Sequence, residues 1–303
     1  MGLFYSYKKA GSGIDKNAPE KNRIVLFFEI LVRKFWKIME VNLLYFIFFL
    51  PLFLGYYSFI SVSNITAKLV VTIACAVVFA VCFGPATAGL FKVIRNYSLE
   101  RHSFIISDFK KGFTENFKQA FVLGLVDIIV TVSVCAAAYV YPQMAKTQDS
   151  NLIYVMLVLS ISLGAAVMMI SFYAYLMIVS VDISFKNIIR NSIVLAYMAI
   201  KKTLLTFLFT VIIAGAFAAL TIYNLYTVFA FPFVPAGIIV LIICFNCYPV
   251  IRKYVIDPYY EKTGQKNPEA DDDDSDDNIF EDMGGKEKPV EQHDTPKRGK
   301  TIS

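Results

Sequence analysis

Six apolar runs dominate the chain, and each is close to the length of a membrane span. They cover roughly residues 41–60, 69–91, 120–141, 152–181, 204–225 and 228–251. A helix needs about 20 apolar residues to cross the ~30 Å hydrocarbon core of a bilayer. The hydrophobic fraction of 57% also exceeds the ~45–50% that is usual for soluble domains. The runs therefore predict an all-α, polytopic membrane bundle of six transmembrane helices.

The segments between these runs alternate between rich and poor in lysine and arginine. The first 40 residues hold eight, residues 92–119 hold six, residues 182–203 hold four, and the segment after residue 251 holds nine. The three intervening connections hold only Lys68 and Lys146 between them. Because basic segments stay on the cytoplasmic side of a membrane, this alternation predicts that both termini are cytoplasmic.

The basic segments before the first, third and fifth runs have an apolar and a charged helical face. In the second of them aromatic residues recur every four positions, at Phe109, Phe113, Phe117 and Phe121. Amphipathic helices of this kind lie at membrane surfaces. One interpretation is three units, each an amphipathic cytoplasmic helix followed by a membrane hairpin. The alternative is that any basic linker beside a membrane becomes amphipathic.

Five residues are expected to fix the topology or to contact lipid. The only tryptophan, Trp36, fits an anchor at the level of the headgroups. The other four are basic residues in the cytoplasmic segments: Lys92, Arg95, Arg190 and Arg252.

Composition divides the chain into three parts. Residues 1–26 are polar and basic, residues 27–260 form the membrane domain, and residues 261–303 hold thirteen acidic against seven basic residues. Such a charged segment with few apolar residues cannot build a packed core. It is predicted to be a disordered acidic tail.

A ridge of small residues ends the second run. Small side chains recur every four positions, at Ala76, Ala80, Gly84 and Ala88. Pro85 and Thr87 lie between the last two of them. Such ridges let membrane helices approach closely, and proline bends a helix. Two interpretations stay open: a tightly packed, kinked helix end, or a contact with a substrate or partner. We expect the Thr87 hydroxyl to bond to a backbone carbonyl that the proline frees.

Asp127 is the most unusual polar residue of the runs. It follows Lys118 by nine residues, or about 13 Å of helix, and so lies near mid-bilayer. A carboxyl there is costly when charged and is by default a functional hypothesis. It either forms a structural hydrogen bond, for example to Asn224 or Asn246, or lines a polar cavity.

No catalytic or nucleotide-binding pattern accompanies these features. The sequence has two histidines, His102 and His293, and no HExxH, GxSxG or P-loop motif. Cys244 and Cys247 form a single CxxC pair inside an apolar run, where core cysteines are the usual interpretation. We therefore expect no enzyme activity, no metal or other cofactor, and no nucleic-acid partner.

Three stretches resemble the YesL-like family of bacterial multi-pass membrane proteins, a domain of unknown function. They are KFWKIMEVNLLYFIFFLP, FGPATAGLFKVIRN and SDFKKGFTENFKQAFVLGLVD. The resemblance covers roughly residues 20–255, and its best motif is GPATAGL at residues 84–90. It implies a helical bundle in the bacterial cytoplasmic membrane and an accessory role in sugar uptake beside ABC transporters.

The resemblance carries over no catalytic residues. Its first functional implication is a non-enzymatic accessory component of carbohydrate uptake, with the lipid bilayer and a sugar ABC transporter permease as partners. The alternative is an autonomous transporter or channel for a small solute, in which Asp127 and the bend at residues 84–87 line a polar path.

Overall fold

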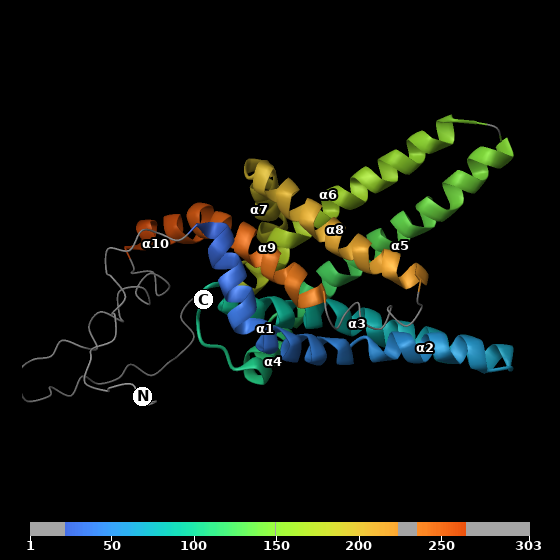
Figure 1. The fold of residues 1–303 in the computed structure, drawn as a ribbon, viewed down its shortest axis with the longest axis horizontal. Coiled ribbons are helices and arrows are strands. Elements are labelled where there is room, and N and C mark those ends of the chain that lie inside the picture. The colour runs from blue at the N-terminus through green and yellow to red at the C-terminus, as the bar shows by residue number, and fades with distance from the viewer. Residues whose placement is uncertain (1–21, 149, 224–234, 265–303) are drawn as a thin grey trace, which may run out of the picture.

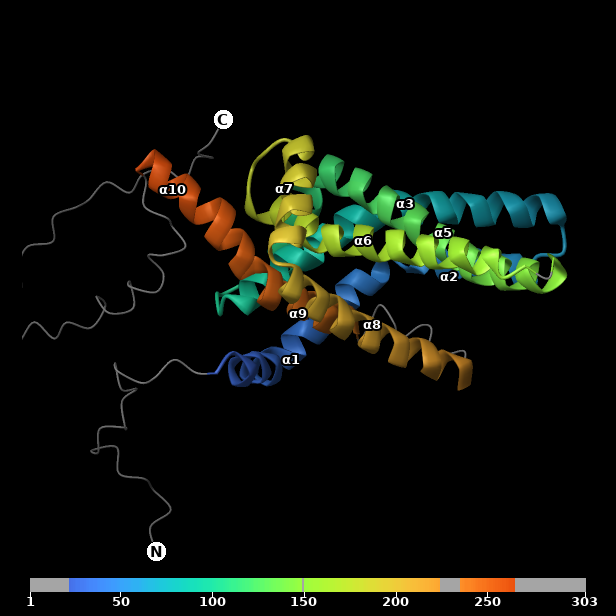
Figure 2. The ribbon, with the colours of Figure 1, turned by 90° about the horizontal axis from the view of Figure 1, so that it is seen from above.

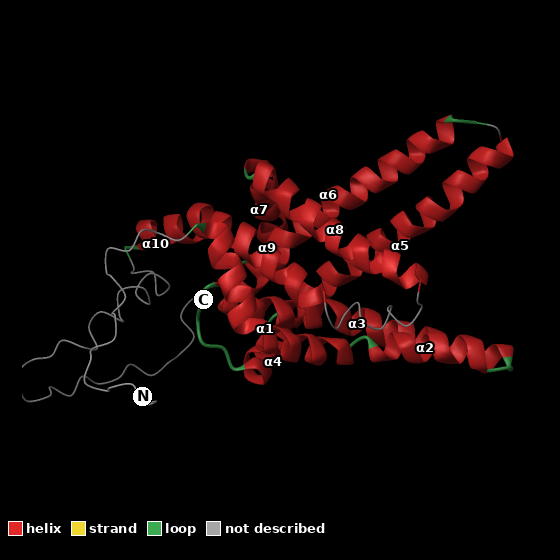
Figure 3. Ribbon diagram, in the orientation of Figure 1, coloured by secondary structure: helices red, strands yellow, loops and turns green. Residues whose placement is uncertain are grey.

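The computed structural model describes residues 22–148, 150–223 and 235–264, and it is helical almost throughout these ranges (Figures 1 and 3). The helices are α1 (Arg23–Ile47), α2 (Leu50–Ser61), α3 (Ile65–Ser98), α4 (Ile105–Glu115), α5 (Phe117–Gln148), α6 (Leu152–Ser180), α7 (Phe185–Met198), α8 (Ile200–Tyr223), α9 (Pro235–Ile251), the π-helical turn η2 (Arg252–Ile256) and α10 (Asp257–Thr263). Among the described residues, five helices are long and apolar enough to cross a membrane, and the bent pair of α1 and α2 makes a sixth. The predicted all-α membrane bundle is confirmed at this level.

The first predicted span is bent. The amphipathic segment and the first half of the apolar run form one continuous helix, α1, which ends at Ile47. The chain then turns by 48° into α2, whose first turn contains Pro51. A proline lacks an N–H and clashes with the carbonyl four residues earlier, which here belongs to Ile47. The helix therefore shows no break at residue 41, where the surface helix was expected to meet the span, and the bend lies beside Pro51.

Two of the remaining spans, α3 and α5, are longer than their apolar runs. α3 has 34 residues, or about 51 Å at 1.5 Å per residue, and α5 and α6 have 32 and 29. α8 covers the fifth run up to residue 223, and α9 covers the sixth from residue 235. The predicted residues between 223 and 235 lie outside the described part of the chain.

The C-terminal boundary of the membrane domain also shifts. α9, η2 and α10 follow one another without a break up to Thr263, so residues 261–263, expected in the tail, are helical. The Asp257-Pro258 pair sits at the start of α10, where proline is tolerated. The rest of the predicted acidic tail and the first 21 residues lie outside the described ranges.

The ends of the helices gather at two opposite ends of the molecule, which are called its poles here. The end of α2 and the start of α3 lie at the same pole as the end of α5 and the start of α6, here called the distal pole (Figures 1 and 2). α4, α7 and α10 lie toward the other, proximal pole (Figure 1). α5 and α6 run side by side away from the body, as do α2 and the first half of α3. The segments rich in lysine and arginine that the structure describes thus gather at the proximal pole.

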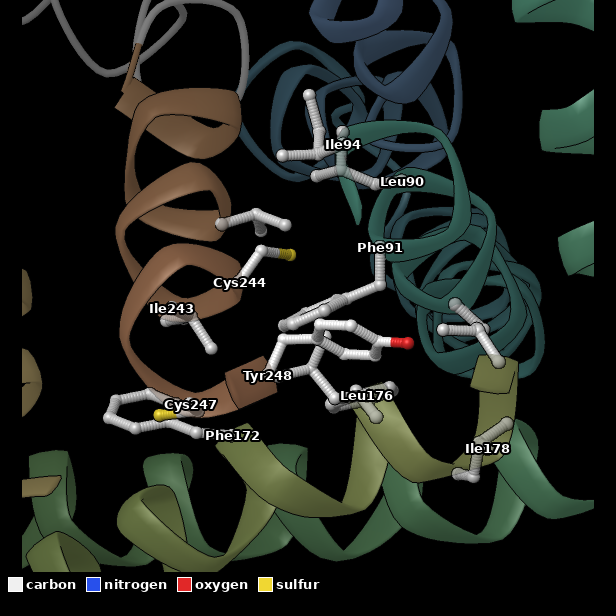
Figure 4. Packing of buried hydrophobic residues seen from close by; sticks show 14 of the residues in the cluster. Leu90, Phe91, Ile94, Phe172, Leu176, Ile178, Ile243, Cys244, Cys247 and Tyr248 are labelled. Atoms are coloured by element: carbon white, nitrogen blue, oxygen red, sulfur yellow. The ribbon is translucent and has the colours of Figure 1, made fainter. Parts of the chain in front are cut away.

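The core lies in the proximal half of the molecule. The second half of α3 packs against α1, α4, α5, α6 and α9, and Leu90, Ile94 and Leu176 are almost completely buried. Figure 4 shows side chains of α3, α6 and α9 meeting there, with Phe91, Leu176 and Cys244 among them. This core fixes the positions of the residues that form the candidate site.

The predicted aromatic ridge of α4 and α5 is an actual row of ring contacts. Phe48 of the bend stacks on Phe113, with ring centroids 5.2 Å apart, and Phe113 contacts Phe117 at 5.8 Å. The row continues from Phe117 to Phe121 across the break at Asn116 between the two helices. It ties the start of α5 to the bend between α1 and α2.

Candidate functional site

The small residues of α3 bring its backbone against two neighbouring helices. A Cβ atom at Gly84 would clash with the backbone carbonyl of Ala120 in α5, and a Cβ at Gly124 would clash with Gly84 itself. One turn further along, Gly89 and Gly112 allow the same approach between α3 and α4. Gly84 therefore serves helix packing, the first of the two interpretations of the GPATAGL segment.

Pro85 lies inside α3, directly after this crossing. The Thr87 hydroxyl donates to the Phe83 carbonyl, at 2.8 Å, and accepts from the Tyr45 hydroxyl of α1, at 3.0 Å. The carbonyl that a proline leaves without an N–H donor is the one four residues earlier, that of Val81. The acceptor of Thr87 is thus not the freed carbonyl that the sequence suggested, and Thr87 instead links α3 to α1.

Asp127 lies on α5 opposite α6. The Ser171 hydroxyl of α6 donates to its carboxylate, with 2.6 Å between Oγ and Oδ1. Tyr175, one turn after Ser171, is 4% exposed, and its hydroxyl lies beside Asp127 and Thr87. The ring of Tyr175 stacks on Phe91 of α3, with centroids 5.3 Å apart, which holds the hydroxyl in this position. The carboxyl group therefore has a hydrogen-bonding partner on α6, the Ser171 hydroxyl.

Of the two asparagines expected to bond to Asp127, the structure places only Asn246. Asn224 lies outside the described residues, and Asn246 is half-buried on α9 but does not line the cavity described next. Sequence reasoning could not choose Ser171, because serines are frequent in α6 and only the pairing of α5 with α6 singles one out. Tyr45 and Tyr175 carried no signal beyond a hydroxyl in an apolar run.

A cavity of about 470 Å³ opens beside this polar cluster. Its lining comes from six helices, α1, α3, α5, α6, α8 and α9, and is overwhelmingly apolar. The polar lining residues are Tyr45, Thr87, Asp127, Thr131, Ser171 and Tyr175. Among the lining side chains that the structure describes, Asp127 alone ordinarily carries a charge near neutral pH.

The four predicted site residues thus separate into two pairs. Thr87 and Asp127 line the same cavity, whereas Gly84 and Pro85 do not line it and lie in the buried part of α3. Within the part of the chain that the structure describes, no group of three or more histidine, cysteine, aspartate or glutamate side chains could hold a metal ion.

The residues expected to fix the topology or contact lipid differ in their exposure and in their ion pairs. Trp36 is 76% exposed on α1, and Arg190 is exposed on α7. Lys92 pairs with Glu115 of α4 at 3.1 Å, and Arg252 lies 3.7 Å from Asp257.

Arg95 was expected to fix the topology or contact lipid, but it is buried inside the protein. It is 7% exposed, donates to the Tyr248 hydroxyl of α9 at 2.8 Å, and lies over the ring of Tyr248. The guanidinium is buried because the second half of α3 is enclosed by its neighbours, and the tyrosine provides both an acceptor and a ring face.

Comparison with known proteins gives one match. Residues 65–140 are similar to a protein family described as a protein of unknown function, DUF624. The matched range runs from the start of α3 into α5 and contains all four predicted site residues, but ends before Ser171 and Tyr175. No curated protein and no solved structure matches the chain. The matched domain has no known function. Together with the apolar helices of membrane length, the match is consistent with an integral, multi-pass membrane protein.

Proposed function

We propose that this chain is a non-enzymatic accessory protein of the bacterial cytoplasmic membrane that assists carbohydrate uptake by a sugar ABC transporter. The YesL-like resemblance supports the link to sugar uptake. One structural observation favours an accessory role over transport of the sugar itself. The cavity beside Asp127 is walled almost entirely by apolar side chains, whereas a sugar needs hydrogen-bonding groups all around its ring.

The orientation is part of the proposal. The proximal pole, with α4, α7 and α10, faces the cytoplasm, and the distal pole faces outward. The uneven distribution of lysine and arginine supports this placement. In the same scheme the chain consists of three units, each a proximal amphipathic helix followed by two spans, and both termini are cytoplasmic.

The test is capture of partners from native membranes. Tagged chain is solubilised in mild detergent, and the bound proteins are identified by mass spectrometry, with an equally tagged, unrelated multi-pass protein as control. The proposal expects enrichment of a sugar ABC permease over the control. Its absence, together with unchanged sugar uptake in cells lacking the chain, would overturn the accessory role.

The alternative is an autonomous transporter or channel for a small solute. The observation that favours it is that Asp127 and Thr87 line one cavity although they come from different helices. If this cavity is part of a transport path, Asp127→Asn abolishes the flux of the small solute across the membrane of reconstituted vesicles, while the protein still folds. If Asp127 is structural, the same substitution changes only the stability, and flux through the native chain does not exceed that of empty vesicles.

A further inference from the structure

The cavity beside Asp127 combines one acidic group with apolar walls. Phenylalanine rings contribute to these walls from three helices, through Phe83 and Phe91 of α3, Phe172 of α6 and Phe207 of α8. α9 adds only aliphatic side chains, and among the described residues no lysine, arginine or histidine lines the cavity. The lining residues thus supply no positive charge to pair with an ionised Asp127.

The protein itself satisfies only part of the carboxylate. Ser171 occupies one site on Oδ1, whereas an ionised carboxylate offers about four acceptor sites. A charge buried among apolar groups is costly unless an opposite charge pairs with it. The chemistry that complements this cavity is therefore a positive charge.

The chemical character of the lining side chains indicates which kind of cation the cavity can bind. Calcium and magnesium take six or more oxygen ligands, and the polar side of this cavity has only one carboxylate and a few hydroxyl groups. Aromatic faces and aliphatic side chains instead favour a cation with an apolar body, because the rings attract its charge and the walls accept its surface. The volume of about 470 Å³ has room for a molecule of several rings.

We propose that this cavity binds a hydrophobic organic monocation, with its positive charge against the Asp127 carboxylate and its apolar body against α6, α8 and α9. This site goes beyond the proposed accessory role, and either can hold without the other.

The pH dependence follows from the groups around Asp127. The titratable neighbours are Tyr45 from α1, Tyr175 from α6 and Cys135 from α5 itself, while α3 contributes the uncharged Thr87 and α8 and α9 contribute no titratable group. Phenols and thiols are mostly neutral from about pH 5 to about pH 8. Protonation of Asp127 removes the only negative charge, so cation affinity decreases as the pH falls and increases as it rises.

The test uses two probes of the same shape and opposite charge. Tetraphenylphosphonium and tetraphenylborate are titrated separately into the purified full chain in nonionic micelles, with protein-free micelles as the blank. The proposal expects saturable binding of the phosphonium and no saturable binding of the borate. Equal binding of the two ions, or none of the phosphonium, would overturn it.

Two variants locate the site. Asp127→Asn keeps an acceptor for Ser171 and is expected to lower phosphonium affinity by about tenfold or more. Ala165→Phe adds a ring to a residue that lines the cavity, keeps Asp127 itself, and is expected to lower affinity as well. Leu159→Phe is the control, because Leu159 is 59% exposed and does not line the cavity. Unchanged affinity in the Ala165→Phe variant contradicts the proposal even if Asp127→Asn does not fold.

Discussion

The two halves of α6 have similar compositions and opposite surroundings. In the distal half, Leu152, Val158 and Leu163 are 77%, 61% and 65% exposed. In the proximal half, residues 171–179 are all buried. Exposed apolar surface of this extent would cause association in water, but in hydrocarbon it has no such cost. Hydrophobicity therefore identifies the span, while contact with the other helices decides which half is packed.

The interactions that stabilise the proximal half of the molecule also differ from those of the distal half. In a bilayer, burial against protein replaces contact with lipid, so association depends on close packing and on hydrogen bonds. The proximal half has both, in the crossing at Gly84 and in the cluster around Asp127. The distal half offers few such contacts, and substitutions there are expected to have small effects.

The largest effect is expected from Gly84→Ala. The new methyl group would clash with the Ala120 carbonyl of α5, and neither backbone can move freely, so we expect a loss of about 3 kcal/mol in the free energy of unfolding. Gly215→Ala is the matched control in distal α8, where no atom lies within 4 Å of the added Cβ. It is expected to stabilise the helix by up to about 1 kcal/mol. Unfolding in mixed micelles measures both changes, and equal effects would refute the contrast.

The next effect compares two leucines of α6. Leu176 is 0% exposed and Leu159 is 59% exposed. Leu176→Ala leaves a cavity and is expected to cost about 2 kcal/mol, whereas Leu159→Ala leaves only lipid contacts to rearrange and should cost less than about 0.5 kcal/mol. Thermal unfolding of the two variants in the same detergent provides the comparison. A greater loss at Leu159 would mean that another protein surface covers the distal half.

A smaller effect is expected from Ser171→Ala, which removes the donor to Asp127. The cost is about 1–2 kcal/mol, because a buried carboxyl loses a hydrogen bond. Ser162→Ala is the control on distal α6, since the Ser162 hydroxyl is exposed and bonds only to the Val158 carbonyl of its own helix. The two free energies of unfolding should differ by about 1 kcal/mol, and no difference would mean that the Asp127 cluster adds nothing to stability.

The smallest effect is expected at the ion pair between Arg33 of α1 and Glu100 after α3. Both side chains are 48% exposed, and exposed pairs contribute little because water and salt screen them. A double-mutant cycle with Arg33→Ala and Glu100→Gln should give a coupling below about 0.5 kcal/mol that disappears at high salt. A larger coupling would show that this pole is less solvated than its exposure indicates.

The sequence predicted the apolar spans, because they follow from local composition. The bend between α1 and α2 lies beside Pro51, whose ring would clash with the Ile47 carbonyl in a continuous helix. Thr87 was identified by its position after a proline, but its acceptor and its link to Tyr45 depend on how α1 packs on α3.

The contacts around the candidate site were beyond a single sequence. Asp127 was conspicuous because a carboxyl is rare in an apolar run, whereas Ser171 and Tyr175 are ordinary residues until α6 brings them to α5. Arg95 follows the pattern of a surface cation, and its burial against Tyr248 of α9 arises from residues 153 positions apart. Such pairs are set by the tertiary arrangement and leave no local pattern.

The central claim is that the chain crosses a membrane with its two poles on opposite sides. Single cysteines are introduced into a cysteine-free chain by Ser63→Cys and Asn151→Cys at the distal pole and by His102→Cys and Ser184→Cys at the proximal pole, all exposed positions. A membrane-impermeant maleimide added to intact cells is predicted to label the two distal positions and to reach the two proximal ones only after the cells are opened. Equal labelling of distal and proximal positions in intact cells would contradict the crossing, and labelling of the proximal positions alone would contradict the proposed orientation.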